Sequence, residues 1–222
     1  NQSKMAMNSY YNDTLYPLQD NVLKLIDGLQ TPFYLTGGTA LSRCYFNHRY
    51  SDDLDFFVNK DPSFIKFSEQ ILSNLIKQFE VEIIIRSESY VSIKVNKILK
   101  IDLVNDVPYR YGELEEKKIF SKVDNVKNIL SNKLSALISR DEVKDIVDIW
   151  IIAKNNKIDW KEIFLSTNSK AVGIFPPDIA RRLMDFPMEL LERIKWIEDT
   201  KPVAKNFQMD LSLICDSLLA TK

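Results

Sequence analysis

Two aspartates separated by one residue, Asp53 and Asp55, are the first side chains whose type and spacing could support chemistry. They lie in Ser-Asp-Asp-Leu-Asp-Phe-Phe (51–57), where residues 54–58 predict a buried strand. Side chains alternate along a strand, so both carboxylates share one face, roughly 7 Å apart. They repel each other unless a cation lies between them, and Mg²⁺ prefers such oxygens. The alternative is a solvated strand end.

The glycine pair Gly37 and Gly38, followed by Thr39, predicts a turn suited to phosphate. Residues 31–36 predict a short strand and residues 38–47 a helix, so the pair precedes a helix N-terminus. Backbone N–H groups point outward there, and glycine lets a phosphate approach closely, while Thr39 could add a hydroxyl. The alternative is a plain tight turn. Because the helix leads into the aspartate strand, phosphates and metal would meet at one edge of the sheet.

A third carboxylate, Asp102, lies in a predicted strand over residues 98–104. Ile101 and Leu103 face one side of this strand and Asp102 faces the other. A carboxylate in an apolar strand is costly unless it is paired or binds a ligand. The alternative is a salt bridge to a neighbouring lysine. With the first pair, Asp102 predicts a site that could hold two metal ions, one beside an attacking hydroxyl and one beside a triphosphate.

Lys133 lies near the centre of an apolar helical stripe over residues 126–138. A lysine there needs either an anion or a path by which its head reaches water. We therefore expect a clamp on a triphosphate or, alternatively, a snorkelling side chain. Replacing this lysine with methionine is expected to preserve or raise stability. If the helix continues to Arg140, this side chain lies on a similar face of the helix and could be a second phosphate contact.

Two further carboxylates, Asp145 and Asp148, lie three residues apart on one face of a helix that is apolar almost all round. Asp141 is expected to be the N-cap of this helix. Buried carboxylates need partners, and Arg140 or Lys133 could serve. A structural ion pair is the alternative for one of the two aspartates.

Taken together, these motifs resemble the AbiEii/AbiGii-type nucleotidyltransferase toxins, within the polymerase-beta-like superfamily. The resemblance covers residues from about 31 to 150. It is carried by Leu-Thr-Gly-Gly-Thr-Ala-Leu (35–41), the aspartate segment 51–57, and Asn-Lys-Leu-Ser-Ala-Leu-Ile-Ser-Arg-Asp-Glu-Val-Lys-Asp-Ile-Val-Asp (132–148). The active-site residues that it implies are Asp53, Asp55, Lys133 and either Asp145 or Asp148.

The resemblance implies an enzyme that transfers NMP from an NTP to an acceptor hydroxyl and releases pyrophosphate, with Mg²⁺ or Mn²⁺ as cofactor. RNA is the implied acceptor, with tRNA favoured, and a cognate antitoxin protein is the implied partner. The expected metal ligands are Asp53, Asp55 and Asp102, and the expected nucleotide contacts are Gly37, Gly38, Thr39, Lys133, Arg140, Asp145 and Asp148. The alternatives are an antibiotic-modifying type of enzyme with a small-molecule acceptor, and an inactive nucleotide-binding module.

The order of the expected elements indicates an α+β nucleotidyltransferase fold, a mixed sheet flanked by helices, followed by a C-terminal helical bundle. We expect a catalytic domain over residues 1–115, with an N-terminal helix over 10–28, and a helical domain over 116–222. Residues 107–124 are interpreted as a connector. Lys133 would have to reach across this division, so we expect both domains to contribute to the active-site cleft.

Charge and cysteine content limit the choice of partners and compartment. With 30 basic and 31 acidic residues, the formal net charge is −1, so no strong nucleic-acid footprint exists and an RNA contact would need a local patch. Cys44 and Cys215 are far apart in expected helices, which is typical of reduced thiols in a cytoplasmic protein. No stretch reaches transmembrane length, so no membrane association is expected.

Overall fold

The computed structural model describes residues 2–140 and 142–220, which divide into two compact units. The first unit contains the residues up to Tyr45 together with Tyr50–Pro108 and Glu113–Asp124. The second unit contains Phe46–Arg49, Tyr109–Gly112 and the residues from Asn125 onward. Two short segments of the second unit therefore interrupt the first unit in sequence.

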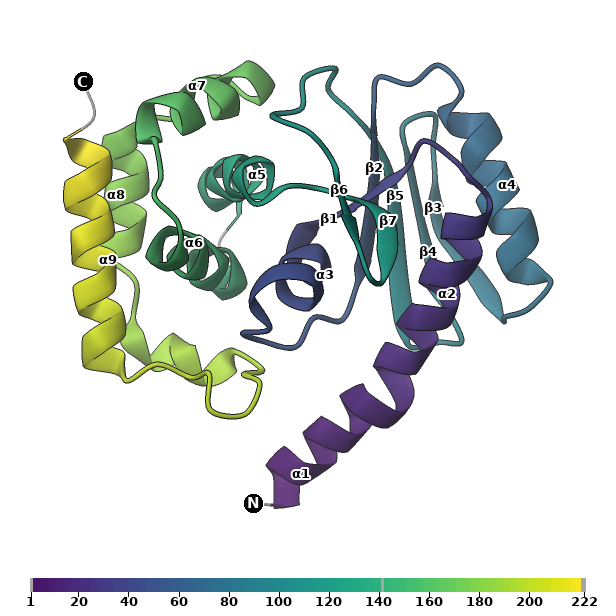
Figure 1. The fold of residues 1–222 in the computed structure, drawn as a ribbon, viewed down its shortest axis with the longest axis horizontal. Coiled ribbons are helices and arrows are strands. Elements are labelled where there is room, and N and C mark those ends of the chain that lie inside the picture. The colour runs from purple at the N-terminus through teal and green to yellow at the C-terminus, as the bar shows by residue number, and fades with distance from the viewer. Residues whose placement is uncertain (1, 141, 221–222) are drawn as a thin grey trace. The chain divides into compact units, whose positions relative to one another are not determined.

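A seven-stranded mixed sheet forms the centre of the first unit (Figure 1), in the order β3-β4-β5-β2-β1-β7-β6. Its strands are β1 (Tyr34–Thr36), β2 (Leu54–Asn59), β3 (Val81–Arg86), β4 (Tyr90–Val95), β5 (Leu99–Asp106), β6 (Glu115–Lys117) and β7 (Phe120–Val123). β2 pairs antiparallel with β1 and parallel with β5. The predicted α+β class with a mixed sheet is confirmed.

The central strand β2 has the alternation that the sequence predicts. Leu54, Phe56 and Val58 are buried, whereas Asp55 and Phe57 between them are partly exposed. Successive side chains on a strand point to opposite faces, so Asp55 lies on the face opposite the buried aliphatic and aromatic side chains. The apolar residues thus anchor the strand and leave its other face for polar groups.

Helices lie on both faces of this sheet, with α2 and α4 on one side and α3 on the other (Figure 1). The helical segments in this part of the chain are α1 (Gln2–Ser9), α2 (Tyr16–Gly28), α3 (Gly37–Leu41) and α4 (Phe64–Ile76), with π-helical turns at Tyr10–Leu15 and Ser42–Phe46. Leu18, Val22 and Ile26 recur at helical spacing on α2 and are buried, which explains why this helix packs on the unit.

The second unit is helical. Its helices are α5 (Val126–Ser139), α6 (Val143–Asn155), α7 (Trp160–Lys170), α8 (Pro176–Met184) and α9 (Ala204–Leu219), with a 3₁₀ turn at Met188–Arg193. Side-chain caps begin two of them, because Asn125 and Asp159 accept hydrogen bonds from the backbone amides of Asn128 and Glu162. α5 packs against α6, α7 and α8, and α9 packs against α6 and α8. The predicted C-terminal helical bundle is therefore present, and its first helix begins at Val126.

The segment 107–124, interpreted as a connector, contains the two strands β6 and β7. Leu35 on β1 pairs with Val123, and the Asp124 amide donates to the Leu35 carbonyl over 2.8 Å. The Thr36 hydroxyl also donates to Asp124 Oδ2 over 2.7 Å. β6 and β7 are three and four residues long, too short for alternation to reveal them. β7 pairs with β1 and β6 pairs with β7, so the sheet extends past the division expected at residue 115.

The structure differs from the sequence at the helix expected after the glycine pair, and the N-cap expected at Asp141 is not tested. The helix expected over residues 38–47 is a short α-helix that continues as a π-helical turn. The expected N-cap Asp141 lies outside the described residues, and Glu142, at the N-cap position of α6, makes no side-chain capping bond. Along the described residues, no helix has both the length and the apolar character needed to cross a bilayer.

Candidate active site

The glycine turn and one carboxylate form a single tightly packed feature of the first unit. Gly37 begins α3 directly after β1 and has a φ of +72°, a backbone angle that residues other than glycine rarely adopt. A Cβ atom at this position would collide with Asp55 Oδ2 and lie 3.1 Å from Asp55 Cγ. Glycine therefore permits both the turn and the close approach of the carboxylate to its backbone.

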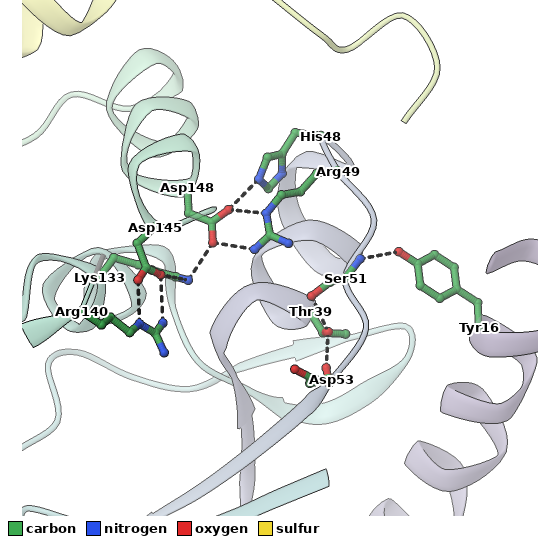
Figure 2. A network of polar contacts seen from close by, with 10 residues as sticks. All are labelled: Tyr16, Thr39, His48, Arg49, Ser51, Asp53, Lys133, Arg140, Asp145 and Asp148. Atoms are coloured by element: carbon green, nitrogen blue, oxygen red, sulfur yellow. Dashed lines mark hydrogen bonds and ion pairs between the residues drawn. The ribbon is translucent and has the colours of Figure 1, made fainter. Parts of the chain in front are cut away.

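Thr39 positions the chain just before β2. Its side chain is buried, and its hydroxyl donates to the Asp53 carbonyl oxygen and shares a 2.9 Å hydrogen bond with the Ser51 hydroxyl (Figure 2). The Ser51 amide donates in turn to the Tyr16 hydroxyl over 3.2 Å. In this structure Thr39 fixes the backbone of Asp53. Its expected contact with a phosphate stays a prediction.

Asp55 and Asp102 are direct neighbours across two parallel strands. The register of β2 and β5 pairs Asp55 with Asp102, and adjacent strands lie about 4.8 Å apart. Paired residues on adjacent strands project from the same face, so both carboxylates lie on the face opposite the buried Ile101 and Leu103. Asp53 immediately precedes β2, so the fold brings all three aspartates to neighbouring positions of one sheet.

Asp102 already has two partners, one for each carboxylate oxygen. The Ser92 hydroxyl donates to Oδ1 over 2.6 Å, and the Lys100 ammonium donates to Oδ2 over 2.7 Å. Burial alone would lower the pKa of Lys100, but the hydrogen bond and charge of Asp102, with the charges of Tyr90 and Asp53, raise it above its usual range. The alternative of a lysine salt bridge is therefore present at this carboxylate.

The donor chemistry of the aspartates suits a metal that arrives with its substrate. Among the described residues, no group of three or more His, Cys, Asp or Glu side chains is arranged to hold a metal ion. Mg²⁺ usually takes one or two carboxylates and completes its shell with waters and substrate phosphates. Two neighbouring carboxylates beside a glycine turn fit that pattern, whereas a closed cage of three carboxylates is not what these side chains form.

A second carboxylate cluster lies within the second unit and is centred on Asp148. This buried side chain accepts hydrogen bonds from His48 Nε2 over 2.9 Å, from Arg49 Nε over 2.8 Å and from Arg49 Nη2 over 2.7 Å (Figure 2). Lys133 Nζ lies 2.8 Å from Asp148 Oδ2, the oxygen that also accepts from Arg49 Nη2. Burial would raise the pKa of Asp148, but the charges of Arg49 and Lys133 and these hydrogen bonds hold it well below its usual range.

Asp145, one helical turn earlier on α6, has its own pair of cations. Lys133 Nζ donates to Oδ1 over 2.7 Å, and Arg140 donates from Nε over 2.8 Å and from a second nitrogen over 3.0 Å. Lys133 therefore bridges both carboxylates and is itself buried. The prediction that Lys133 binds triphosphate stays a prediction. Its side chain does not snorkel in this structure, because two buried anions hold its ammonium.

The structure thus brings together Lys133, Arg140, Asp145 and Asp148, as the sequence pattern indicates, and adds Arg49 and His48. Sequence reasoning overlooked Arg49. The available signal was a count of charges, because two carboxylates on a buried helix face require more cationic partners than one lysine supplies. His48 carries a further feature, since its Nδ1 is buried with no hydrogen-bond partner among the described residues.

A mixed sheet, a glycine turn that opens a helix and aspartates on adjacent strands define the nucleotidyltransferase fold. The structure is similar to the nucleotidyltransferase toxin MenT4 of Mycobacterium tuberculosis, with a TM-score of 0.64 and 14% identity over 94% of this chain and 84% of that one. It is also similar to JHP933 of Helicobacter pylori, with a TM-score of 0.55 and 20% identity over 91% and 92% of the two chains. These likenesses support the fold.

The family follows from the sequence as a whole. A family described as nucleotidyl transferase AbiEii toxin, type IV TA system, matches residues 25–213, and the chain belongs to this family. An uncharacterized protein of Aquifex aeolicus (strain VF5) is 33% identical over 142 residues, which are 61% of this chain and 65% of that protein. The family that the glycine and aspartate motifs resemble is therefore confirmed.

Proposed function

We propose that this protein transfers NMP from an NTP to an acceptor hydroxyl, with Mg²⁺ or Mn²⁺ as cofactor. The observation that carries the proposal is the placement of Asp55, which rests on the Gly37 turn and pairs in register with Asp102, in a chain of the AbiEii nucleotidyltransferase family. A phosphate bound at the turn would lie beside both carboxylates. Phosphate chemistry and cation chemistry are thus combined on one face of one sheet.

Each residue then has a defined task. Asp53 and Asp55 would hold the metal, which supplies charge stabilisation for the triphosphate and lowers the pKa of the acceptor hydroxyl. Gly37 and Gly38 offer backbone N–H groups to the phosphates. Thr39 keeps Asp53 in place.

The reaction exchanges one phosphorus–oxygen bond for another. The acceptor oxygen attacks the α-phosphorus in line, the bond to the β-phosphate oxygen breaks, and pyrophosphate leaves. Asp102 would take the proton of the acceptor hydroxyl or complete the metal site. The protein forms no covalent bond to the substrate in this reaction. Positioning of the reactants and stabilisation of charge in the transition state supply most of the rate enhancement.

For the acceptor we favour RNA, with tRNA as the leading substrate. This acceptor is what the resemblance of the motifs implies, and the description of the family as a toxin of a TA system suggests a cognate antitoxin as a protein partner. A small-molecule acceptor is the second candidate. The antibiotic-resistance factor ANT(2'')-Ia shares the fold, with a TM-score of 0.51 and 11% identity over 69% of this chain and 91% of that one, and a net charge of −1 gives no general attraction to RNA. A nucleotide-binding module without activity is the third.

One experiment separates these candidates. The protein is incubated with each α-labelled NTP and with Mg²⁺ or Mn²⁺, in parallel reactions that contain either total bacterial RNA or small hydroxyl compounds, and the labelled product is identified. Transfer to RNA that weakens steeply with salt supports an RNA acceptor, because bound Lys and Arg side chains release counterions from phosphates. Unlabelled RNA together with salt-insensitive labelling of a small hydroxyl compound moves the function to the second candidate. No incorporation with any nucleotide supports the third.

A further inference from the structure

The side chain of Lys100 places an ammonium group beside Asp102 on one face of the sheet. Lys100 and Asp102 are two residues apart on β5 and therefore share this face. On the neighbouring strand β4, Ser92 pairs in register with Asp102, and Lys94 pairs with Lys100. One hydroxyl (Ser92), one carboxylate (Asp102) and two lysines are thus arranged side by side, and of the two lysines it is Lys100 that forms the ion pair with Asp102.

Both carboxylate oxygens of Asp102 accept a hydrogen bond, but one donor is buried and the other is exposed to solvent. Ser92 is buried and donates to Oδ1 over 2.6 Å, so it holds the carboxylate in a fixed orientation. Lys100 donates to Oδ2 over 2.7 Å, yet its side chain remains 41% exposed, against 13% for Asp102. An ammonium on a flexible four-carbon stem that solvent can reach makes a weak ion pair and can move away.

We propose that Lys100 is a resident cation, which occupies Asp102 in the metal-free protein and must leave it when a divalent cation binds. This inference rests on the carboxylate site of the proposed function. Oδ2 is the oxygen that a divalent cation would take on Asp102, because its partner Lys100 is exposed and movable, whereas the Ser92 donor at Oδ1 is buried. Lys100 therefore competes with the metal and keeps its affinity low until substrate phosphates contribute further ligands.

The test measures Mn²⁺ affinity without nucleotide, from the electron paramagnetic resonance signal of free Mn²⁺. Lys100→Met removes the competing ammonium and is expected to tighten Mn²⁺ binding about tenfold. Lys100→Arg retains a cation that can grip a carboxylate with two nitrogens, so Mn²⁺ binding should be no tighter than in the wild type. Lys94→Met is the matched control, since it removes the same charge from the position directly opposite, and wild-type affinity is expected.

Melting temperatures give a second readout that does not depend on activity. In EDTA, Lys100→Met should melt below the wild type, because Asp102 has lost its cation, and Mn²⁺ should raise its melting temperature more than that of the wild type. Equal Mn²⁺ affinity in Lys100→Met and wild type, including no binding in either, overturns the proposal. An equal gain in Lys94→Met also overturns it, because general charge would then be the cause.

The failure of this inference and the failure of the proposed function are distinguishable. If Lys100→Met binds Mn²⁺ more tightly while the wild type labels no acceptor, the resident cation stands and nucleotidyl transfer falls. If the wild type labels an acceptor while Lys100→Met and wild type bind Mn²⁺ equally, transfer stands and the resident cation falls.

Discussion

The two carboxylate clusters of this protein use the same residue type in opposite surroundings. In the first unit, Asp102 is held by one partly exposed ammonium and one hydroxyl. In the second unit, Asp148 is sealed from solvent and contacts His48, Arg49 and Lys133. At Asp102 the exposed Lys100 ammonium can be replaced by another cation, whereas at Asp148 the buried Arg49 and Lys133 are held inside the unit. Burial and the number of partners distinguish a candidate site from a scaffold better than residue type does.

The largest expected effect comes from the sealed cluster. Asp148→Ala leaves Arg49 and Lys133 buried with less negative charge to balance them, and removing one member of a buried ion pair typically costs about 3–5 kcal/mol. We expect a loss in the upper part of that range in urea unfolding. Asp216→Ala, at an exposed position on α9, is the control and should change little. A loss no greater than that of the control would mean that the cluster is not a scaffold.

Lys133→Met tests the same cluster from its cationic side. The sequence predicts unchanged or higher stability for this variant, on the premise of an unpaired ammonium, but the structure places that ammonium between two buried carboxylates. We now expect a loss of about 3 kcal/mol, because Asp145 and Asp148 would each keep only their arginine or histidine partners.

Nucleotide affinity of Lys133→Met adds a separate test. A greater loss of NTP than of NMP affinity would show that Lys133 also contacts the triphosphate. Equal affinities in variant and wild type would restrict it to the scaffold.

Asp55→Asn tests the exchangeable cluster and should act on rate instead of stability. The variant keeps the shape beside Gly37 but removes a metal ligand, so label transfer should fall on the order of 100-fold or more, with an unchanged or higher melting temperature. Asp216→Asn again provides the control. Transfer near the wild-type rate in Asp55→Asn would remove this carboxylate from the active site.

The smallest expected effect is a pH dependence from His48. Burial, with the charges of Arg49 and Lys133, lowers the pKa of His48 from its ordinary 6.5 despite the opposing contribution of Asp148. The unfolded chain therefore takes up a proton at higher pH than the folded protein, so stability is present above pH 6.5 and falls as the pH drops below it. Urea unfolding at several pH values measures this decline, which His48→Gln should remove. An identical decline in that variant would assign it to other groups.

The sequence was informative wherever local pattern decides the outcome. The alternation in 54–58 and 98–104 predicts both strands and puts each aspartate on the face opposite the apolar residues, whereas the register that pairs Asp55 with Asp102 comes from the structure. The contacts of Asp148 could not all be predicted in the same way. The sequence offers Lys133 or Arg140 as partners of Asp145 and Asp148, but Arg49 and His48, which also contact Asp148, lie 99 and 100 residues from it. β6 and β7 could not be predicted because β7 depends on pairing with β1, and β6 on pairing with β7, which no short segment reveals by itself.

The close contact between Gly37 and Asp55 offers a way to displace the Asp55 carboxylate without changing any charge. One methyl group at position 37 would strain a backbone angle of +72° and displace the carboxylate behind it. Gly37→Ala would leave every ionisable side chain in the sequence. If the proposed function holds, such a variant would lose nucleotidyl transfer while keeping the net charge of the wild type, and it would serve as a charge-matched inactive reference in binding experiments.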